Sequence, residues 1–478
     1  MKKLEPQHWN HPCAAHLLAR SGFGAPPDQI SLAASRSLED AVDALFQTPA
    51  NITPPEWVTP EAAVKPDLQM LRALTDDERR RYRRKFQRET AQQQRELTGW
   101  WLERMISSPC PLQEKMTLFW HGHFATSIRK VRSAYMMYAQ NQTLRRNAFG
   151  NWRQLITAVS QDPAMLVYLD NTRSRAGAPN ENYARELMEL FTLGEGRYTE
   201  DDIKEAARAF TGWMVHPKRY AFFNNVRNHD RKPKTFFGRT GNFTGHDIIR
   251  IILEQEKAAE FLVSRLWNFF AYENPSPDIV QELAAQFRDN DYELQPLLKS
   301  IFMSEAFYSP QAMHTQIKSP AQWLVGSCIA LGIRKPDTSQ SINALRSLGQ
   351  ELFAPPNVKG WDGGYAWITT SSLTSRYNLA KQLINQRKRL PPGEGKNDRR
   401  FGGYIVNTAN VLPWDKRNSL EQARNHLELN VYQTVLSPAD RSKIDGYFDH
   451  LNPVSDWTDS DVRNILHVLM STPQYQLT

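Results

Sequence analysis

Apolar residues recur along most of the chain at the spacing of helices that bury one face. Residues 248–308 give a clear example, in which Leu262, Leu266 and Phe269 follow at steps of four and three and Phe261 lies beside the first of them. The pattern predicts a mainly α, multi-helix globular protein with long structured loops and little or no sheet.

Capping and turn residues divide this pattern into segments. Thr75 and Glu78 form a capping-box pattern ahead of a long helix to about Met105, and Gly194 ends a helix that starts near Glu181. The other predicted helical regions are two helices in 11–47, then 111–124, 131–147, 151–170, 199–213, 248–308, 321–331, 342–348 and most of the C-terminal part.

Polar segments rich in turn residues separate these helices. Residues 171–180 and 214–247 are predicted to be loops, the second with a short hairpin. Segment 386–404, rich in Arg, Lys, Gly and Pro, is predicted to be a flexible linker or loop. It separates a main helical domain, 1–385, which carries the candidate site, from a helical segment, 405–478, which we expect to pack on it.

The composition fits a folded protein with a sizeable core. Of the 478 residues, 40% are hydrophobic and 23% are charged, and the net charge is only +8. A basic run, 79–85, starts the long helix, and it suits either a solvated helix face or an anion-binding face. Nucleic-acid binding through this helix is an alternative that we do not favour, because the excess charge is local and acidic residues balance it elsewhere.

Cysteine usage and hydropathy bear on the cellular compartment. Cys13, Cys110 and Cys328 have no short spacing, which predicts reduced, buried thiols. No apolar run is long enough to span a membrane, and the basic start of the chain is not followed by an apolar segment. We expect a cytoplasmic protein, or a periplasmic or exported one if a leader has been removed.

A His-Gly-His segment is the first candidate for chemistry. His121 and His123 flank Gly122 at the end of an apolar, helix-like stretch. If the glycine ends the helix, both imidazoles are free to converge, and neutral imidazoles are common metal ligands and proton carriers. Structural hydrogen bonding is the alternative for both side chains.

The predicted helix 181–193 supplies carboxylates. Arg185, Glu186 and Glu189 share one arc of it, and side chains three residues apart meet on a helix surface. Carboxylates placed this way can bind a divalent metal ion beside histidines from another helix. The alternative is an ordinary salt-bridged surface with Glu181–Arg185 and Arg185–Glu189 pairs.

Two loop segments complete the candidates. His229 and Asp230 are adjacent in the long loop, where they can act as an acid–base pair, a ligand with its orienting partner, or part of a turn. Segment 357–367, rich in Gly and Trp, can line a pocket or form a packing turn. The chain has no serine-nucleophile elbow, phosphate-binding glycine loop or dinucleotide fingerprint.

Several segments together resemble one bacterial family, catalogued as domain of unknown function number 1800. The most distinctive segment is PNENYARELMELFTLG at 179–194. The others, in the same order along the chain, are HLLARSGFG at 16–24, WHGHFA at 120–125, YLDN at 168–171, ARAFTGW at 207–213, HD at 229–230, KSP at 318–320 and PPNVKGW at 355–361.

The resemblance implies a mainly helical protein, often exported through the twin-arginine route. It also implies a partner, because such proteins are often encoded beside a second uncharacterised family that looks like alkaline phosphatases and sulfatases. It implies no catalytic residues, although the His-Gly-His and Glu-rich segments coincide with its signature stretches.

The leading functional hypothesis is an enzyme with a His/Glu metal or acid–base site that acts on an unknown, anionic or polymeric substrate. Its predicted metal ligands are His121, His123, Glu186 and Glu189. Arg185 would orient a carboxylate or an anionic substrate, and His229 with Asp230 would complete the site. The main alternative is a non-catalytic accessory protein that binds a phosphatase- or sulfatase-like enzyme.

Overall fold

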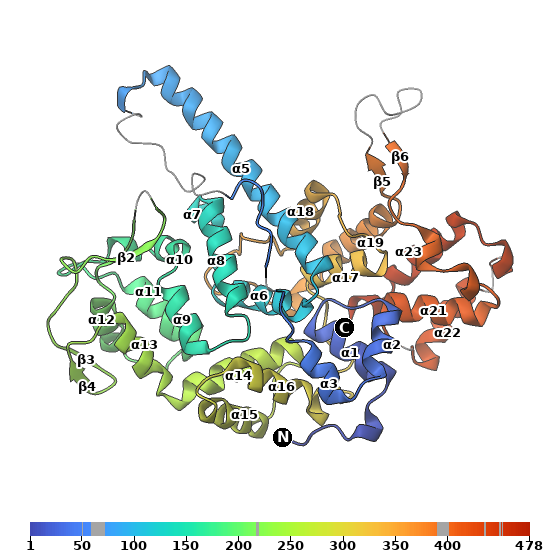
Figure 1. Cartoon of the computed structure of the whole chain (residues 1–478), viewed down its shortest axis with the longest axis horizontal. Helices are drawn as coiled ribbons and strands as arrows, with labels where there is room; N and C mark the ends of the chain where they lie inside the picture. The colour runs from blue at the N-terminus through green and yellow to red at the C-terminus, as the bar shows by residue number, and fades with distance from the viewer. Residues whose placement is uncertain are drawn as a thin grey trace.

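The computed structural model describes residues 1–49, 51–58, 72–216, 219–389, 401–434, 436–448, 451 and 453–478, and these are mainly helical, as predicted (Figure 1). The α-helices are α1 (His11–Ser21), α2 (Pro27–Ala34), α3 (Leu38–Ala44), α5 (Asp76–Ser107), α6 (Pro111–His123), α7 (Ile128–Val131), α8 (Ala134–Arg146), α9 (Trp152–Ser160), α10 (Pro163–Tyr168), α11 (Glu181–Glu186), α12 (Glu200–Ala209), α13 (Gly245–Leu253), α14 (Glu256–Phe270), α15 (Pro277–Asp289), α16 (Leu294–Phe302), α17 (Pro320–Ala330), α18 (Thr338–Ser347), α19 (Thr370–Ile384), α20 (Thr408–Val411), α21 (Leu420–Tyr432), α22 (Pro438–Phe448) and α23 (Asp459–Ser471).

Shorter helical turns join them. The 3₁₀ turns are η1 (Pro6–His8), η3 (Asn171–Arg173), η5 (Glu305–Tyr308), η6 (Gly364–Trp367), η8 (Trp414–Lys416), η9 (Val454–Asp456) and η10 (Gln474–Gln476), and η4 (Leu187–Thr192) is a π-helix. The predicted helix 181–193 is therefore α11 followed by one wider turn. The region 11–47 holds three helices, α1 to α3, rather than the predicted two.

Strands occur as antiparallel pairs. β1 (Trp213–Val215) pairs with β2 (Phe222–Asn224), and β3 (Lys234–Phe236) pairs with β4 (Arg239–Gly241), so the predicted loop 214–247 does contain hairpin structure. β5 (Arg387–Arg389) pairs with β6 (Phe401–Tyr404), at the two ends of the predicted linker. Residues 390–400 of that linker lie outside the described residues.

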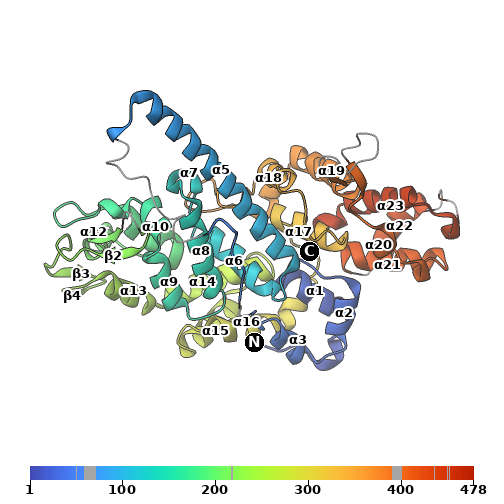
Figure 2. The same cartoon turned by 45° about the horizontal axis from the view of Figure 1, so that its top comes forward.

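The long helix α5 has two different halves. The Thr75 hydroxyl and the Glu78 carboxylate form the predicted capping box, and the buried residues of the helix begin only at Leu97. Both views show the N-terminal half of α5 extending away from the rest of the protein (Figure 1 and Figure 2). Only the C-terminal half therefore contributes to the core.

Two hydrophobic cores share the interior. The first joins α1, α3, α6 and helices α9 to α16, and the second joins the C-terminal half of α5, α8, α17 and the helices from α19 to α23. Residues of both 321–384 and 406–475 belong to the second core. The three cysteines are free and buried, as predicted.

Helix α6 lies at the centre of the molecule, between the two cores (Figure 1). Phe119 and Trp120 belong to the first core and Leu118 to the second. A helix covered on all sides is normally apolar, yet α6 also buries Glu114 and Lys115. Buried charged groups are costly unless they have a role, so these two residues and the two histidines make α6 the centre of the candidate functional site.

Candidate functional site

The two histidines of the His-Gly-His segment point to different sides of α6. Helix α6 ends at His123, in agreement with the predicted helical stretch 111–124, but both histidines are helical and the predicted convergence of their imidazoles is wrong. Residues two apart on a helix are separated by roughly 200° around its axis. His121 Nε2 accepts a hydrogen bond from the Phe353 backbone N–H at 3.0 Å, whereas His123 Nε2 lies 3.0 Å from the Phe191 carbonyl oxygen.

His121 has the surroundings of a structural side chain. Its ring packs against Trp101, Phe353 and Trp361, and burial lowers its pKa from 6.5 to about 3. The neutral ring is thus the form that the folded protein requires. The structure gives His121 a packing and hydrogen-bonding role, and its predicted role in chemistry stays a prediction.

This burial predicts acid sensitivity. The unfolded chain binds a proton at this histidine below pH 6.5, and the folded protein binds it only near pH 3, so folding stability falls as the pH drops through that window. The slope for one such group is roughly 1.4 kcal/mol per pH unit. His121→Asn keeps an acceptor for Phe353 but does not titrate, so we expect urea unfolding between pH 6.5 and 3 to show a shallower loss than in the wild type. An unchanged slope would contradict this.

The carboxylates of the Glu-rich segment lie on the π-helix and on the helix before it. Arg185 pairs with Glu200 at 2.8 Å and with Glu181 at 3.6 Å, so the second of these pairs was predicted correctly. Glu189 accepts a hydrogen bond from the Tyr198 hydroxyl at 2.7 Å. Burial and the neighbouring Glu189 raise the pKa of Glu186. The two carboxyls therefore influence each other, while Arg185 serves in a surface ion-pair group.

His229 and Asp230 have local structural partners. His229 Nδ1 lies 2.9 Å from the Thr211 carbonyl oxygen, and Asp230 forms an ion pair with Arg208 at 2.8 Å. The Arg208 guanidinium lowers the pKa of the Asp230 carboxyl. Both residues border a cavity of about 700 Å³ on the surface of the β-hairpin region.

No group of three or more His, Cys, Asp or Glu residues in the described ranges is placed to hold a metal ion. The structure thus gives no support to the metal set His121, His123, Glu186 and Glu189. Of the seven predicted site residues, only His123 lines the large cavity described next.

A cavity of about 730 Å³, here called the central cavity, lies beside α6. One face of α6 and one face of α14 form two of its walls, and residues 361–367 form a third, which is the first of the two alternatives given for segment 357–367. The remaining wall comes from residues 311–322. The polar or charged side chains that line it are Lys115, His123, Arg265, Asn268, Tyr272, Glu273, Asn274, Gln311, Thr315, Gln316, Ser319, Gln322, Gln350, Asp362 and Tyr365.

Two cations of the central cavity lack a carboxylate partner. Lys115 is 3% exposed, and its ammonium donates to the Gln322 amide oxygen. Arg265 lies over the Phe261 ring, 5.7 Å from its centroid. Neither side chain forms an ion pair within the described part of the chain, and desolvation by burial lowers the pKa of both. Lys115 is buried and Arg265 is half-buried, and a cation removed from water without a carboxylate partner is costly, so the cavity favours an anion.

His123 has an unprotonated ring nitrogen, and Arg265 is the cation of the cavity that acts on this ring. Because a carbonyl only accepts hydrogen bonds, the proton of the neutral ring is on Nε2, facing Phe191. Nδ1 is buried and has no hydrogen-bond partner in the described structure. Burial, and secondarily the positive charge of Arg265, keep the pKa of His123 well below 6.5. The ring is thus a neutral base in the absence of ligand.

A close backbone contact holds the third wall against α6. Gly360 has φ +85°, and a Cβ there would overlap the carbonyl oxygen of Gly122. A side chain at Gly360 would push the chain away, and Trp361 and Trp367 with it.

Glu273 and Asp362, the carboxylates that line the cavity, are both exposed.

Periodicity alone did not identify Lys115 or Arg265. The available signal was a lysine within the apolar stretch 111–124 and an arginine among the aromatic residues 261–270. A charged residue on a helix that is otherwise apolar is a reason to look for a buried ligand.

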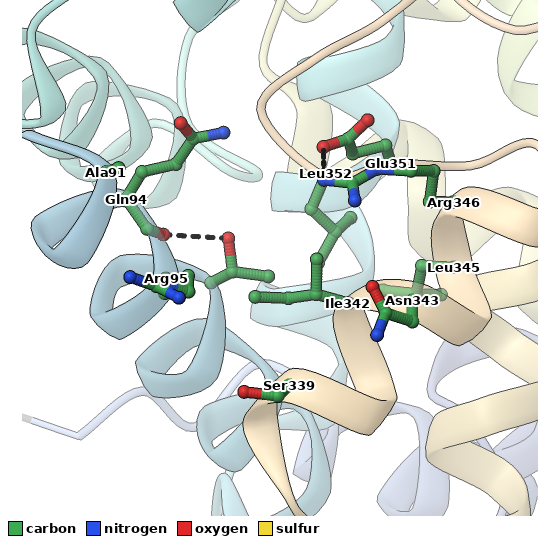
Figure 3. A pocket seen from close by; sticks show the side chains of 11 residues that line it. Ala91, Gln94, Arg95, Ser339, Ile342, Asn343, Leu345, Arg346, Glu351 and Leu352 are labelled. Atoms are coloured by element: carbon green, nitrogen blue, oxygen red, sulfur yellow. Dashed lines mark hydrogen bonds and ion pairs between the residues drawn. The ribbon is translucent and has the colours of Figure 1, made fainter. Parts of the chain in front are cut away.

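A third cavity, of about 380 Å³, lies between α5 and α18 (Figure 3). Arg95 and Arg346 both border it, and Figure 3 shows Arg346 bonded to Glu351, at 2.7 Å. Glu351 also pairs with Arg129 at 2.7 Å. Since a carboxylate already neutralises Arg346, this cavity offers an anion less than the central cavity does.

Comparisons with known proteins place the chain in a family without assigning an activity. Neither the curated proteins nor the solved structures include a match to it. No described helix is both long and apolar enough to cross a membrane. A model of a protein family of unknown function, DUF1800, matches residues 16–477, nearly the whole chain. The protein belongs to the DUF1800 family.

Proposed function

We propose that the protein is an enzyme that takes an anionic substrate into the central cavity, where Lys115 and Arg265 bind the substrate and His123 transfers a proton. The observation that carries this proposal is the pairing of two cations that lack carboxylate partners with a neutral imidazole on the walls of one cavity. A pocket with convergent polar groups and perturbed pKa values is the usual form of an active site.

The substrate itself would prepare the base. A general base is most effective when its pKa lies near the working pH, and the pKa of His123 is well below 6.5 in the free protein. An anion bound at Arg265 offsets the positive charge that helps to lower this pKa. Its own negative charge favours the imidazolium, so the pKa of His123 rises on binding. Proton transfer is then coupled to occupancy of the cavity.

The other predicted residues stay outside this proposal. His121, Arg185, His229 and Asp230 have the structural partners described above, and a role for Glu186 and Glu189 in metal binding remains a separate prediction. A divalent metal ion is not needed for the proton transfer proposed here.

A substitution at His123 tests the proposal. Gln at this position keeps an N–H donor for the Phe191 carbonyl but has no basic atom. We expect a mixture of phosphate monoesters and carboxylic acids to contain a compound that the wild-type protein binds and converts, detected by ³¹P NMR and mass spectrometry. His123→Gln should bind that compound with similar affinity and convert it at least 100-fold more slowly, in line with loss of acid–base catalysis.

His229→Gln serves as the matched control, because that histidine also contacts a backbone carbonyl but lies at a different cavity. Binding without conversion by the wild type would contradict the enzymatic part of the proposal and favour a binding protein. Equal turnover by His123→Gln would contradict the role of His123.

A further inference from the structure

The central cavity has positive charge at two separate places. Lys115, Phe119 and His123 follow one another at steps of four residues, so they share one face of α6. Eight residues of helix place Lys115 and His123 roughly 12 Å apart along the axis. Arg265 acts electrostatically on His123, and Arg20 acts on Lys115. One pole therefore contains Lys115, and the other contains Arg265 beside His123.

The Lys115 pole has additional positive charge behind it. Arg20 is 1% exposed, and its Nε and Nη1 atoms have no hydrogen-bond partner in the described residues. No carboxylate side chain in the described chain pairs with Arg20. The field at this end thus favours a strongly anionic group.

Aromatic rings occupy the distance between the poles. Phe119 and Phe269 both line the cavity, with ring centroids 5.1 Å apart. Lys115 Nζ lies 5.4 Å from the Phe269 ring, and the Phe119 ring stacks on His123 at 5.7 Å. An extended ligand that runs from one pole to the other would cross an apolar surface in its middle.

We infer that the ligand of the central cavity is an elongated molecule with an anionic group at each end and an apolar or ring-containing middle. This inference rests on the proposed function, because it specifies the substrate class of the same cavity. Two anionic groups roughly 12 Å apart would match the spacing set by α6. The exposed carboxylates Glu273 and Asp362 are screened by water and oppose such a ligand less than buried ones would.

Synthetic phosphates of different length test the inference by isothermal titration calorimetry. Hexanediol bisphosphate carries two phosphates at about the required spacing, ethanediol bisphosphate carries them close together, and hexyl phosphate carries one. We expect the long bisphosphate to bind at least tenfold more tightly than either of the others. Lys115→Met and Arg265→Met should each reduce its affinity to about that of hexyl phosphate.

Lys257→Met is the control, since Lys257 is an exposed α14 residue that does not line the cavity. Lys115→Gln gives a second variant if the Met variant fails to fold. Equal affinity for the long bisphosphate and hexyl phosphate would overturn the two-pole inference. Equal affinity for the two bisphosphates would overturn it as well. Either result would leave the proposed function intact. Absence of binding by all three phosphates would overturn the inference and count against an anionic substrate.

Discussion

Replacing Glu114 by Gln is expected to lower the free energy of unfolding by roughly 3–5 kcal/mol. The Glu114 side chain is completely buried in α6. Its carboxylate pairs with Arg145 at 2.8 Å and with Arg104 at 3.0 Å, and it accepts the Trp101 indole N–H at 3.0 Å. Removing the negative charge leaves Arg145, which is 1% exposed, as an uncompensated buried cation.

Chemical denaturation at neutral pH measures this loss. Glu103→Gln is the matched control, because Glu103 also lies on a helix and pairs with a cation, Lys335 at 3.6 Å, but is partly exposed. We expect the control to change stability by less than about 0.5 kcal/mol. A Glu114→Gln variant that lost no more than the control would show that Glu114 is not essential for the charge balance of α6.

The same carboxylate predicts a dependence on pH. Burial raises the pKa of Glu114, but Arg145 and Arg104 outweigh burial and hold it below 4.5. A group with a lowered pKa in the folded state contributes stability above its unfolded value, and this contribution is lost as the pH falls through the folded value. The wild type should therefore lose part of its stability below pH 4.5, whereas Glu114→Gln should lack that part of the loss.

The local signals in the sequence predicted most helices well. The capping boxes at Thr75–Glu78 and Thr199–Asp202 are present, because a cap is formed by residues only three apart. The helical stretch 111–124 was also predicted well, but the convergence of its two histidines was predicted wrongly, because both lie within α6. Gly360, from a distant segment, packs on the carbonyl of Gly122, and no pattern within 111–124 reveals that contact.

The candidate site was harder to predict, because its contacts also join segments that are distant in the sequence. The partners of His121 and His123 are the backbones of Phe353 and Phe191, and periodicity within a segment contains no information about such contacts. The π-helix at Leu187–Thr192 also changes the direction of the side chains that a regular helical angle assigns. The Trp-rich segment 357–367 was identified as a possible pocket wall because glycines and aromatics close together favour fixed turns.

Replacing Lys115 by Met is expected to change both the free energy of unfolding and the stabilisation that the proposed ligand gives. Its ammonium is buried with only one amide oxygen as a polar partner, so the folded protein bears the cost of desolvating it. Lys115→Met has a similar length and no charge. We expect this variant to be more stable than the wild type by roughly 1–4 kcal/mol in the absence of ligand.

The sign of its pH dependence follows from the lowered pKa. Between that lowered value and 10.5, the unfolded chain holds a proton at Lys115 that the folded protein does not, so wild-type stability rises with pH. Arg20 and Gln322 face Lys115 from α1 and α17, and burial lowers the pKa of Arg20 to about 9. Because Lys115→Met keeps Arg20, the difference between the variant and the wild type isolates the contribution of Lys115. The advantage of Lys115→Met should therefore diminish as the pH rises toward 10.5.

Ligand should offset the stability advantage of Lys115→Met. An anion that binds the folded protein stabilises it by RT ln(1 + [L]/Kd), and this gain requires Lys115. With hexanediol bisphosphate at 100 times its Kd, the wild type should gain about 2.7 kcal/mol, and Lys115→Met should gain much less. Lys335→Met, at a side chain that is 80% exposed, should match the wild type in both conditions. A Lys115→Met variant that is less stable than the wild type without ligand, yet gains as much from the bisphosphate, would show that Lys115 supports the fold rather than the cavity. A Lys115→Met variant that is more stable than the wild type without ligand, and that gains little from the bisphosphate, would mean that the protein keeps a costly buried charge because its ligand needs it.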